Sequence, residues 1–97
     1  MISPTSLQQL KEANARRQAR AVEAARTALA VLNQVSFPKA STVEALRVLA
    51  LRVDHPLLAL RQLAELHDPP LTKDTYAARL RRAIEIAAEY QARRERG

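Results

Sequence analysis

Five prolines and a single glycine constrain this chain of 97 residues more than any other feature. The prolines stand at positions 4, 38, 56, 69 and 70, and a proline lacks the N–H that continues a helix. The single glycine is the last residue, Gly97. Between the prolines, alanine and leucine dominate, and runs of β-branched or aromatic residues are missing. The sequence therefore predicts an all-α fold with four helical segments.

The first segment is predicted to be one long helix, from about Pro4 to about Val35, with two unlike halves. Ser3 is a suitable N-cap, since serine is favoured at that position, and Pro4 follows it at the first helical position, where proline is favoured. An apolar stripe with 3-4-3 spacing follows in the second half: Val22, Ala25, Leu29 and Leu32. The first half carries mainly polar and cationic side chains on the same rows. We expect the second half to pack and the first half to project or to contact a polar partner.

The second and third segments are shorter. Ser41 and Glu44 have the spacing of a capping box, which predicts that the second helix starts at Ser41 and ends before Pro56. Its apolar residues are Val43, Leu46, Leu49, Ala50 and Val53. The third helix is predicted to cover about Pro56 to Leu66. Its apolar residues are Leu57, Leu60, Leu63 and Ala64, as expected of a helix packed between others.

A stiff turn and a fourth helix follow. Residues 67–71 contain Pro69-Pro70 and cannot be helical. Thr72 is the predicted N-cap of the fourth helix, and Leu71 and Tyr76 have the positions of a hydrophobic staple. We expect Tyr76 at the edge of a core formed by Ala77, Leu80, Ile84 and Ala87. The helix is expected to fade within residues 92–97, which leaves a basic tail.

The outward side of the fourth helix carries the residues of greatest interest. Thr75, Arg79 and Arg82 fall on this side together with the small Ala78, and Arg81 lies on a flank. Glu85, Glu89 and Glu95 are expected to form ion pairs with arginines along the helix surface.

Charge is distributed unevenly along the chain. The net charge is +6, and thirteen of the sixteen cations are arginine, which binds phosphate in a bidentate manner. Residues 1–38 carry five cations and two anions, residues 39–71 carry four of each, and residues 72–97 carry seven cations and four anions. Basic flanks around a neutral middle favour an acidic polymer as partner, nucleic acid first, over a solvated surface alone.

The last three predicted helices have the order of a tri-helical helix-turn-helix. In that motif the final helix enters the major groove of duplex DNA with its N-terminal end first. Thr72 and the free N–H groups of the first turn could hold a phosphate, and Arg79 and Arg82 could reach guanine edges or flanking phosphates. In the first helix, three arginines are either solvated or in contact with phosphates: Arg16, Arg17 and Arg20.

Residues 63–74 read LAELHDPPLTKD, and residues 79–82 read RLRR. This stretch, together with EANARR at residues 12–17, resembles the C-terminal helix-turn-helix domain of the WhiA family, bacterial regulators of sporulation and cell division. The resemblance covers roughly residues 10 to 90 and implies a fold similar to the promoter-reading region 4 of sigma factors. It also implies that Thr72 and Lys73 lie at the entry of the recognition helix and that Arg79, Arg81 and Arg82 lie along it.

Three positions depart from the pattern of that family. Ala59 stands where serine is usual, Ala64 where glycine is usual, and Tyr76 where a smaller aliphatic residue is usual. The missing serine cap would cost about 1 kcal/mol unless the third helix starts earlier, at Pro56.

Composition excludes several other classes of protein. The chain has no cysteine, so disulfides, thiolate zinc sites and cysteine nucleophiles are excluded, and the cytoplasm, with association to the nucleoid, is the expected location. No apolar stretch reaches the length of a membrane span. No serine or threonine has a base and orienting partner, so we expect no enzyme, cofactor, metal or small-molecule substrate.

We therefore expect a single DNA-binding domain over residues 1–97, with a long helix and linker at 1–38 and the helix-turn-helix at 39–97. The alternative is a helical protein-interaction module that docks a sigma factor or another regulator.

Overall fold

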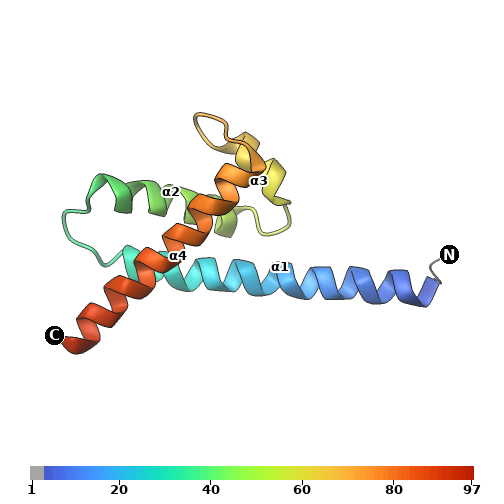
Figure 1. Ribbon diagram of the computed structural model, residues 1–97, viewed down its shortest axis with the longest axis horizontal. Coiled ribbons are helices and arrows are strands. Elements are labelled where there is room, and N and C mark those ends of the chain that lie inside the picture. The colour runs from blue at the N-terminus through green and yellow to red at the C-terminus, as the bar shows by residue number, and fades with distance from the viewer. Residues whose placement is uncertain (1–3) are drawn as a thin grey trace.

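The computed structural model describes residues 4–97, and the predicted cap at Ser3 lies outside them. The fold is all-α: four helices, α1 (Pro4–Leu32), α2 (Ala40–Asp54), α3 (Leu60–Leu66) and α4 (Lys73–Arg96), form the described part of the chain. Helix α4 crosses α1 obliquely, and α2 and α3 complete the body on one side (Figure 1). The molecule measures 54 × 33 × 19 Å, and the N-terminal half of α1 projects beyond the other helices (Figure 1).

The two halves of α1 differ as the sequence predicts. Val22, Ala25 and Leu32 are buried, and Leu29 is half-buried against the core. In the N-terminal half, Leu7 and Leu10 remain 46% and 50% exposed. The helix ends at Leu32, about three residues before the predicted end, and backbone hydrogen bonds then form a tight turn.

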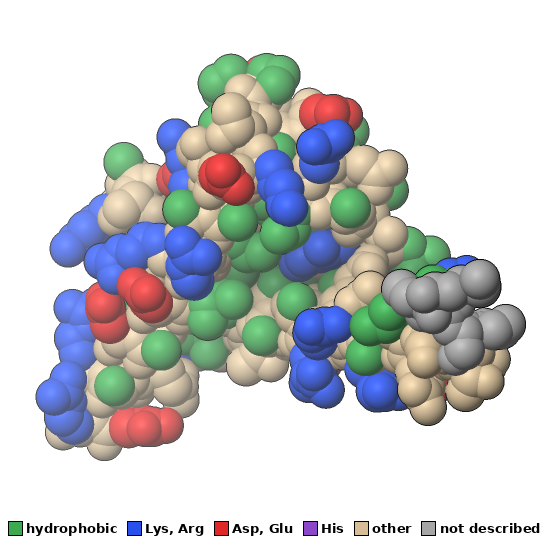
Figure 2. Space-filling model, turned by 45° about the vertical axis from the view of Figure 1, so that its right-hand side comes forward, with side chains coloured by type: hydrophobic (Ala, Val, Ile, Leu, Met, Phe, Trp, Pro, Cys, Tyr) green, Lys and Arg blue, Asp and Glu red, His purple; other side chains and the backbone are tan. Residues whose placement is uncertain are grey.

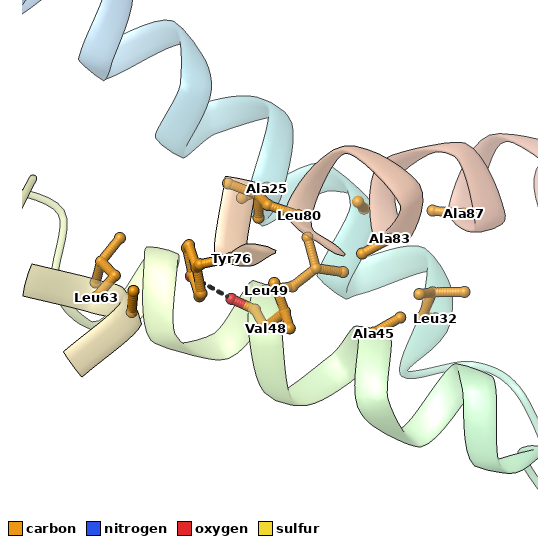
Figure 3. Close-up of a cluster of buried hydrophobic side chains, with 12 residues drawn as sticks. Ala25, Leu32, Ala45, Val48, Leu49, Leu63, Tyr76, Leu80, Ala83 and Ala87 are labelled. Carbon is orange, nitrogen blue, oxygen red and sulfur yellow. Dashed lines mark hydrogen bonds between the residues drawn. The ribbon is translucent and has the colours of Figure 1, made fainter. Parts of the chain in front are cut away.

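The core lies where α1, α2 and α4 cross (Figure 3). Alanines at positions 25, 45, 83 and 87 allow the helix backbones to approach closely, and Val48, Leu49 and Leu80 fill the space between them. Tyr76 is fully buried at this crossing, and its hydroxyl donates a 2.7 Å hydrogen bond to the carbonyl of Val48. The prediction that Tyr76 lies at the core edge is therefore wrong. Its ring can be fully buried because the Val48 carbonyl accepts the hydrogen bond of the hydroxyl, which would otherwise lack a partner in the core.

Helix α2 departs from its predicted start and face. It begins at Ala40 after Lys39 as N-cap, without a side-chain cap, so the capping box of Ser41 and Glu44 is wrong. Glu44 instead binds residues of the turn and of α4. The buried residues are Thr42, Ala45, Val48, Leu49 and Arg52. Val43, predicted to be apolar core, is 43% exposed, because the inward side of the helix lies one position away from it.

Helix α3 is shorter than predicted. It begins at Leu60, so Pro56 and Leu57 belong to the preceding loop, and Leu57 is 89% exposed rather than buried. Ala59 is the N-cap residue, and its backbone N–H donates a 2.9 Å hydrogen bond to Oε1 of Gln62. Gln62 therefore supplies one half of a capping box, and the half that needs a serine side chain is absent.

Helix α4 begins as predicted and ends later. Thr72 is its N-cap, and the helix continues to Arg96, so the expected basic tail is helical. Good helix formers fill residues 83–96, and arginines in the last turn interact favourably with the helix dipole. Of the predicted inner residues, Leu80 and Ala87 are buried, whereas Ala77 and Ile84 are only half-buried.

Candidate nucleic-acid interface

The turn between α3 and α4 is held from inside. His67 is 3% exposed, and its Nδ1 lies 2.8 Å from the carbonyl oxygen of Pro69. The backbone N–H of Leu71 donates a 2.9 Å hydrogen bond to the carbonyl of Ala64, a buried residue of α3. The turn therefore fixes the direction in which α4 leaves α3, which a helix-turn-helix requires.

The N-terminal end of α4 carries polar groups at the surface. The Oγ1 of Thr72 accepts a 3.1 Å hydrogen bond from the Thr75 N–H and donates one of 2.8 Å to the Thr75 hydroxyl. Lys73 is exposed and has no ion pair within the described residues. Asp74 occupies the first turn, so its negative charge opposes a phosphate placed directly on the helix N-terminus.

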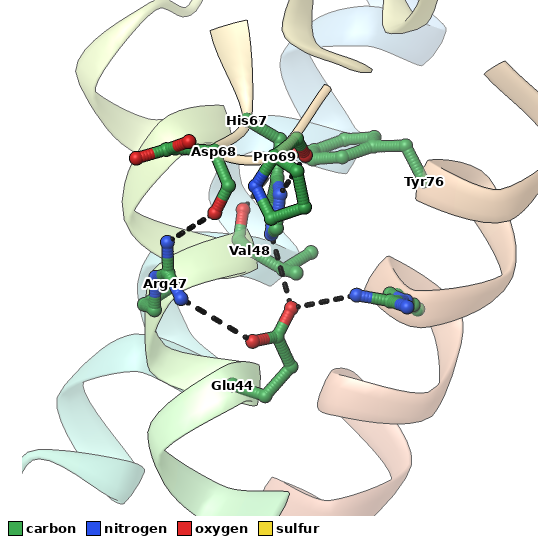
Figure 4. Close-up of polar contacts among 8 residues, drawn as sticks. Glu44, Arg47, Val48, His67, Asp68, Pro69 and Tyr76 are labelled. Atoms are coloured by element: carbon green, nitrogen blue, oxygen red, sulfur yellow. Dashed lines mark hydrogen bonds and ion pairs between the residues drawn. The ribbon is translucent and has the colours of Figure 1, made fainter. Parts of the chain in front are cut away.

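Glu44 of α2 connects the turn to α4 (Figure 4). Its Oε1 lies 3.0 Å from Nε2 of His67 and 2.9 Å from Nη1 of Arg79. Its Oε2 lies 3.7 Å from Nη1 of Arg47, whose Nη2 donates a 2.6 Å hydrogen bond to the carbonyl of Asp68. Partial burial raises the pKa of Glu44, but hydrogen bonding to His67 and Arg79 and electrostatic attraction to them together outweigh it and leave this pKa below its ordinary value.

The three arginines predicted on α4 are exposed, in three different settings. Arg79 has a 44% exposed side chain that is paired with Glu44. Arg82 is 57% exposed and lies 3.2 Å from Glu85 and 3.1 Å from Glu89, and the hydrogen bonds with Glu89 and Glu85 raise its pKa. Arg81 is exposed and, among residues 4–97, has no ion pair. The pairs of Arg82 confirm the expected ion pairs of Glu85 and Glu89. The expected pair of Glu95 is wrong: among the described residues it accepts a 3.3 Å hydrogen bond from Gln91 and forms no ion pair.

Arg16, Arg17 and Arg20 are exposed on the projecting half of α1. Arg17 donates a hydrogen bond to Oδ1 of Asn14, one turn away. No hydrogen bond or ion pair joins these arginines to α4 in the part of the chain that is described. Figure 2 shows basic side chains both near the N-terminal end of α1 and toward the C-terminal end of α4. The arginines of α1 are thus separate from those of α4.

Comparison with known proteins identifies this arrangement. The profile of the WhiA C-terminal HTH domain matches residues 6–87. The chain belongs to this family. Its relatives include three proteins named probable cell division protein WhiA: from Acidothermus cellulolyticus (42% identical over 80 residues), Cutibacterium acnes (37% over 90 residues) and Bifidobacterium adolescentis (48% over 46 residues).

These alignments cover 78%, 88% and 46% of the chain, respectively. The chain spans only 23%, 26% and 15% of the length of these WhiA relatives. No solved structure matches it.

Three residues of this WhiA helix-turn-helix were missed by the sequence analysis as contributors to the site: Arg47, Arg52 and His67. Arg52 is 3% exposed, and its Nη2 donates to the carbonyls of His55 at 2.9 Å and Leu58 at 2.7 Å. Burial lowers the pKa of Arg52. Its position one turn after the buried Val48 and Leu49 was the available signal, since a cation on an apolar row must bind buried acceptors.

The described residues contain no cluster of His, Asp or Glu with which to bind a metal ion. None of the helices described combines the length and apolar character needed to span a membrane.

Proposed function

We propose that the chain binds duplex DNA sequence-specifically, as the DNA-binding domain of a WhiA-like transcriptional regulator. Residues 1–97 form one such domain, and α4 enters the major groove with its N-terminal end first. The observation that carries this proposal is the pair of exposed arginines, Arg79 and Arg82, which lie one turn apart on the outward side of α4 together with the small, exposed Ala78. They lie on a helix whose start is fixed by Thr72 and by the turn.

Each of the other site residues has a role in this proposal. Lys73 and the hydroxyls of Thr72 and Thr75 hold phosphates beside the groove, while Asp74 keeps phosphate away from the helix axis itself. Arg81 reaches the backbone on the flank of α4. The arginines of α1 contact phosphates further along the duplex: Arg16, Arg17 and Arg20.

Arg79 and Arg82 must exchange their carboxylate partners for DNA. Both pairs are at least 44% exposed on the arginine side, and exposed ion pairs contribute roughly 0–1 kcal/mol. A bidentate contact to the correct base discriminates by about 1–3 kcal/mol. The exchange is therefore favourable at a matching base and close to neutral elsewhere, which supports specificity.

Selection of bound sites from random duplexes, followed by a salt series on the selected site, tests the proposal. About five phosphate contacts predict a slope of log affinity against log salt near −4 to −5 in a fluorescence anisotropy titration. Absence of salt-sensitive binding to any duplex near about 100 mM salt would refute DNA binding.

Docking to a protein, such as a sigma factor or another regulator, is the second candidate function. A groove beside the C-terminal half of α4 favours it.

A further inference from the structure

A groove of about 830 Å³ lies between the loop that joins α1 to α2, the start of α2 and the side of α4 that runs from Arg79 to Arg94. Its lining includes the apolar side chains of Leu32, Val35, Ile86 and Tyr90. Val35, Ile86 and Tyr90 are only partly buried by the protein itself. A cavity of this size with an apolar lining is typical of a binding site.

Phe37 stands at the edge of this groove with its side chain in water. It is 97% exposed, and its φ of 55° lies in the left-handed region that non-glycine residues avoid. That conformation costs about 1–2 kcal/mol, and an exposed aromatic ring gains none of the free energy that burial of its apolar area would provide. Exposed aromatic rings on strained loops are typical of contact sites, where the ring becomes buried by a partner.

The charged residues around the groove are mostly cations. Five basic side chains line it: Lys39, Arg79, Arg82, Arg93 and Arg94. The two acids of the lining, Glu44 and Glu89, are already paired with Arg79 and Arg82. Lys39 and Arg93 have no ion pair anywhere in residues 4–97, and Arg94 lies over the ring of Tyr90 at 5.8 Å. Three cations without a carboxylate partner therefore surround an apolar groove.

A duplex read by the N-terminal end of α4 does not reach the far end of the groove, where Arg93 lies. Arg93 lies fourteen residues after Arg79, about 21 Å further along the helix axis. The major groove is about 8.5 Å deep, so a helix that enters with its N-terminal end leaves its C-terminal half outside. The cations of the groove could attract phosphate, but the apolar side chains between them would bury only aliphatic or aromatic groups of a partner.

We propose that this groove binds an acidic amphipathic helix of a partner protein. The apolar face of that helix packs on Val35, Ile86 and Tyr90, and the ring of Phe37 closes over its edge. Carboxylates of the partner pair with Lys39, Arg93 and Arg94. This is the mode in which a helix docks into a hydrophobic groove, with charge complementarity that selects the partner. Arg79 and Arg82 line the near end of the groove and also belong to the proposed DNA face, but the contacts proposed here, at Phe37, Lys39, Arg93 and Arg94, do not depend on DNA binding.

Selection from a phage-displayed library of random helical peptides on the full chain tests this inference. We expect enriched peptides with a net negative charge and apolar residues at i, i+3 or i+4, and i+7. Synthetic copies are then titrated by fluorescence anisotropy against Phe37→Ser and against Leu57→Ser, which removes a similarly exposed apolar side chain outside the groove. The first variant should lose at least tenfold in affinity, and the second less than twofold.

Charge reversal gives a second, independent readout. Arg93→Glu should weaken binding of the acidic peptides at least tenfold, whereas Arg61→Glu, on the exposed side of α3, should change it less than threefold. Failure to enrich any peptide, enrichment of neutral or basic peptides, or equal binding to Phe37→Ser would each overturn the proposal.

The same variants separate this inference from the proposed function. Phe37→Ser should keep the DNA affinity of the unaltered chain while it loses the peptides. If Phe37→Ser instead weakened DNA binding, the groove would belong to the DNA surface and the inference would be wrong. If the chain bound the peptides as described but bound no duplex, the proposal for the groove would be supported and the proposed DNA binding would be wrong.

Discussion

The two ends of α4 belong to one basic helix but are held very differently. At the N-terminal end, Thr72 caps the helix, Tyr76 is fully buried, and Glu44 joins Arg79 to the turn. At the C-terminal end, Arg93 has no ion pair among the described residues, and Tyr90 is partly exposed beside an open groove. Rigid side chains suit the reading of a fixed base sequence, whereas adaptable ones suit a flexible protein partner.

Removal of the buried tyrosine should break this difference most strongly. Tyr76→Ala is expected to lower the free energy of unfolding by about 3–5 kcal/mol, because it leaves a cavity at the crossing of the helices. The matched change at the other end of the helix, Tyr90→Ala, should cost less than half as much, since its side chain is only partly buried. Urea denaturation followed by circular dichroism measures both. Equal losses would mean that the two ends are anchored alike.

The DNA contacts should divide between the ends in the same way. Arg79→Ala with Arg82→Ala is expected to weaken binding to the selected duplex by roughly 100-fold, since each specific contact contributes about 1–3 kcal/mol. Arg93→Ala with Arg94→Ala removes the same charge about 17–23 Å further along the helix and should weaken binding only severalfold. Anisotropy titrations at one fixed salt concentration compare the two. A larger loss for the second pair would reverse the proposed orientation of α4.

Features that depend on residues close together in the sequence could be predicted. The Pro69-Pro70 turn, the Thr72 cap and the two halves of α1 depend on residues three or four positions apart, and all three were predicted correctly. The arginines expected on the outside of α4 are exposed for the same reason, since a helix places its residues by a fixed rotation.

Contacts between helices could not be predicted in this way. From the sequence, Glu44 is suited both to a capping box with Ser41 and to an ion pair with a residue of another helix. The packing of α2 against α4 places it beside Arg79 and His67 instead. Leu57 matches the spacing of the α3 stripe, but the helix starts three residues later, where Gln62 can cap it. Tyr76 could be buried only because Val48 offers a carbonyl from another helix.

The carboxylates around Arg82 provide a smaller test at the N-terminal end. Glu85→Gln with Glu89→Gln removes two negative charges and both ion pairs of Arg82. We expect DNA affinity to rise a few-fold, because exposed pairs contribute only roughly 0–1 kcal/mol and the released arginine meets phosphate more readily. Non-specific duplexes should gain as much as the selected site or more, so the ratio of the two affinities should fall. A rise in that ratio would show that these acids do not restrain Arg82.

The smallest effect should be the pH dependence of the link between α2 and α4. The pKa of Glu44 in the folded chain lies below the 4.5 that is usual for a glutamate, so the charged form favours folding. Its contribution is therefore present above about pH 4.5 and is lost as the pH falls through the lower value of the folded state. Because the Glu44 side chain is 35% exposed, solvent screens its ion pairs, and this contribution to the free energy of unfolding should be roughly 1 kcal/mol or less.

Glu44→Gln should thus unfold at lower urea concentration than the unaltered chain at pH 7, and the difference should shrink below about pH 4.5. Glu65→Gln, an exposed glutamate on α3 without an ion pair among residues 4–97, is the control and should follow the unaltered chain at every pH. If the Glu44→Gln difference stayed constant down to pH 3, the carboxylate charge would not be what joins the turn to α4. The N-terminal end of the helix would then be anchored by Tyr76 and the turn alone.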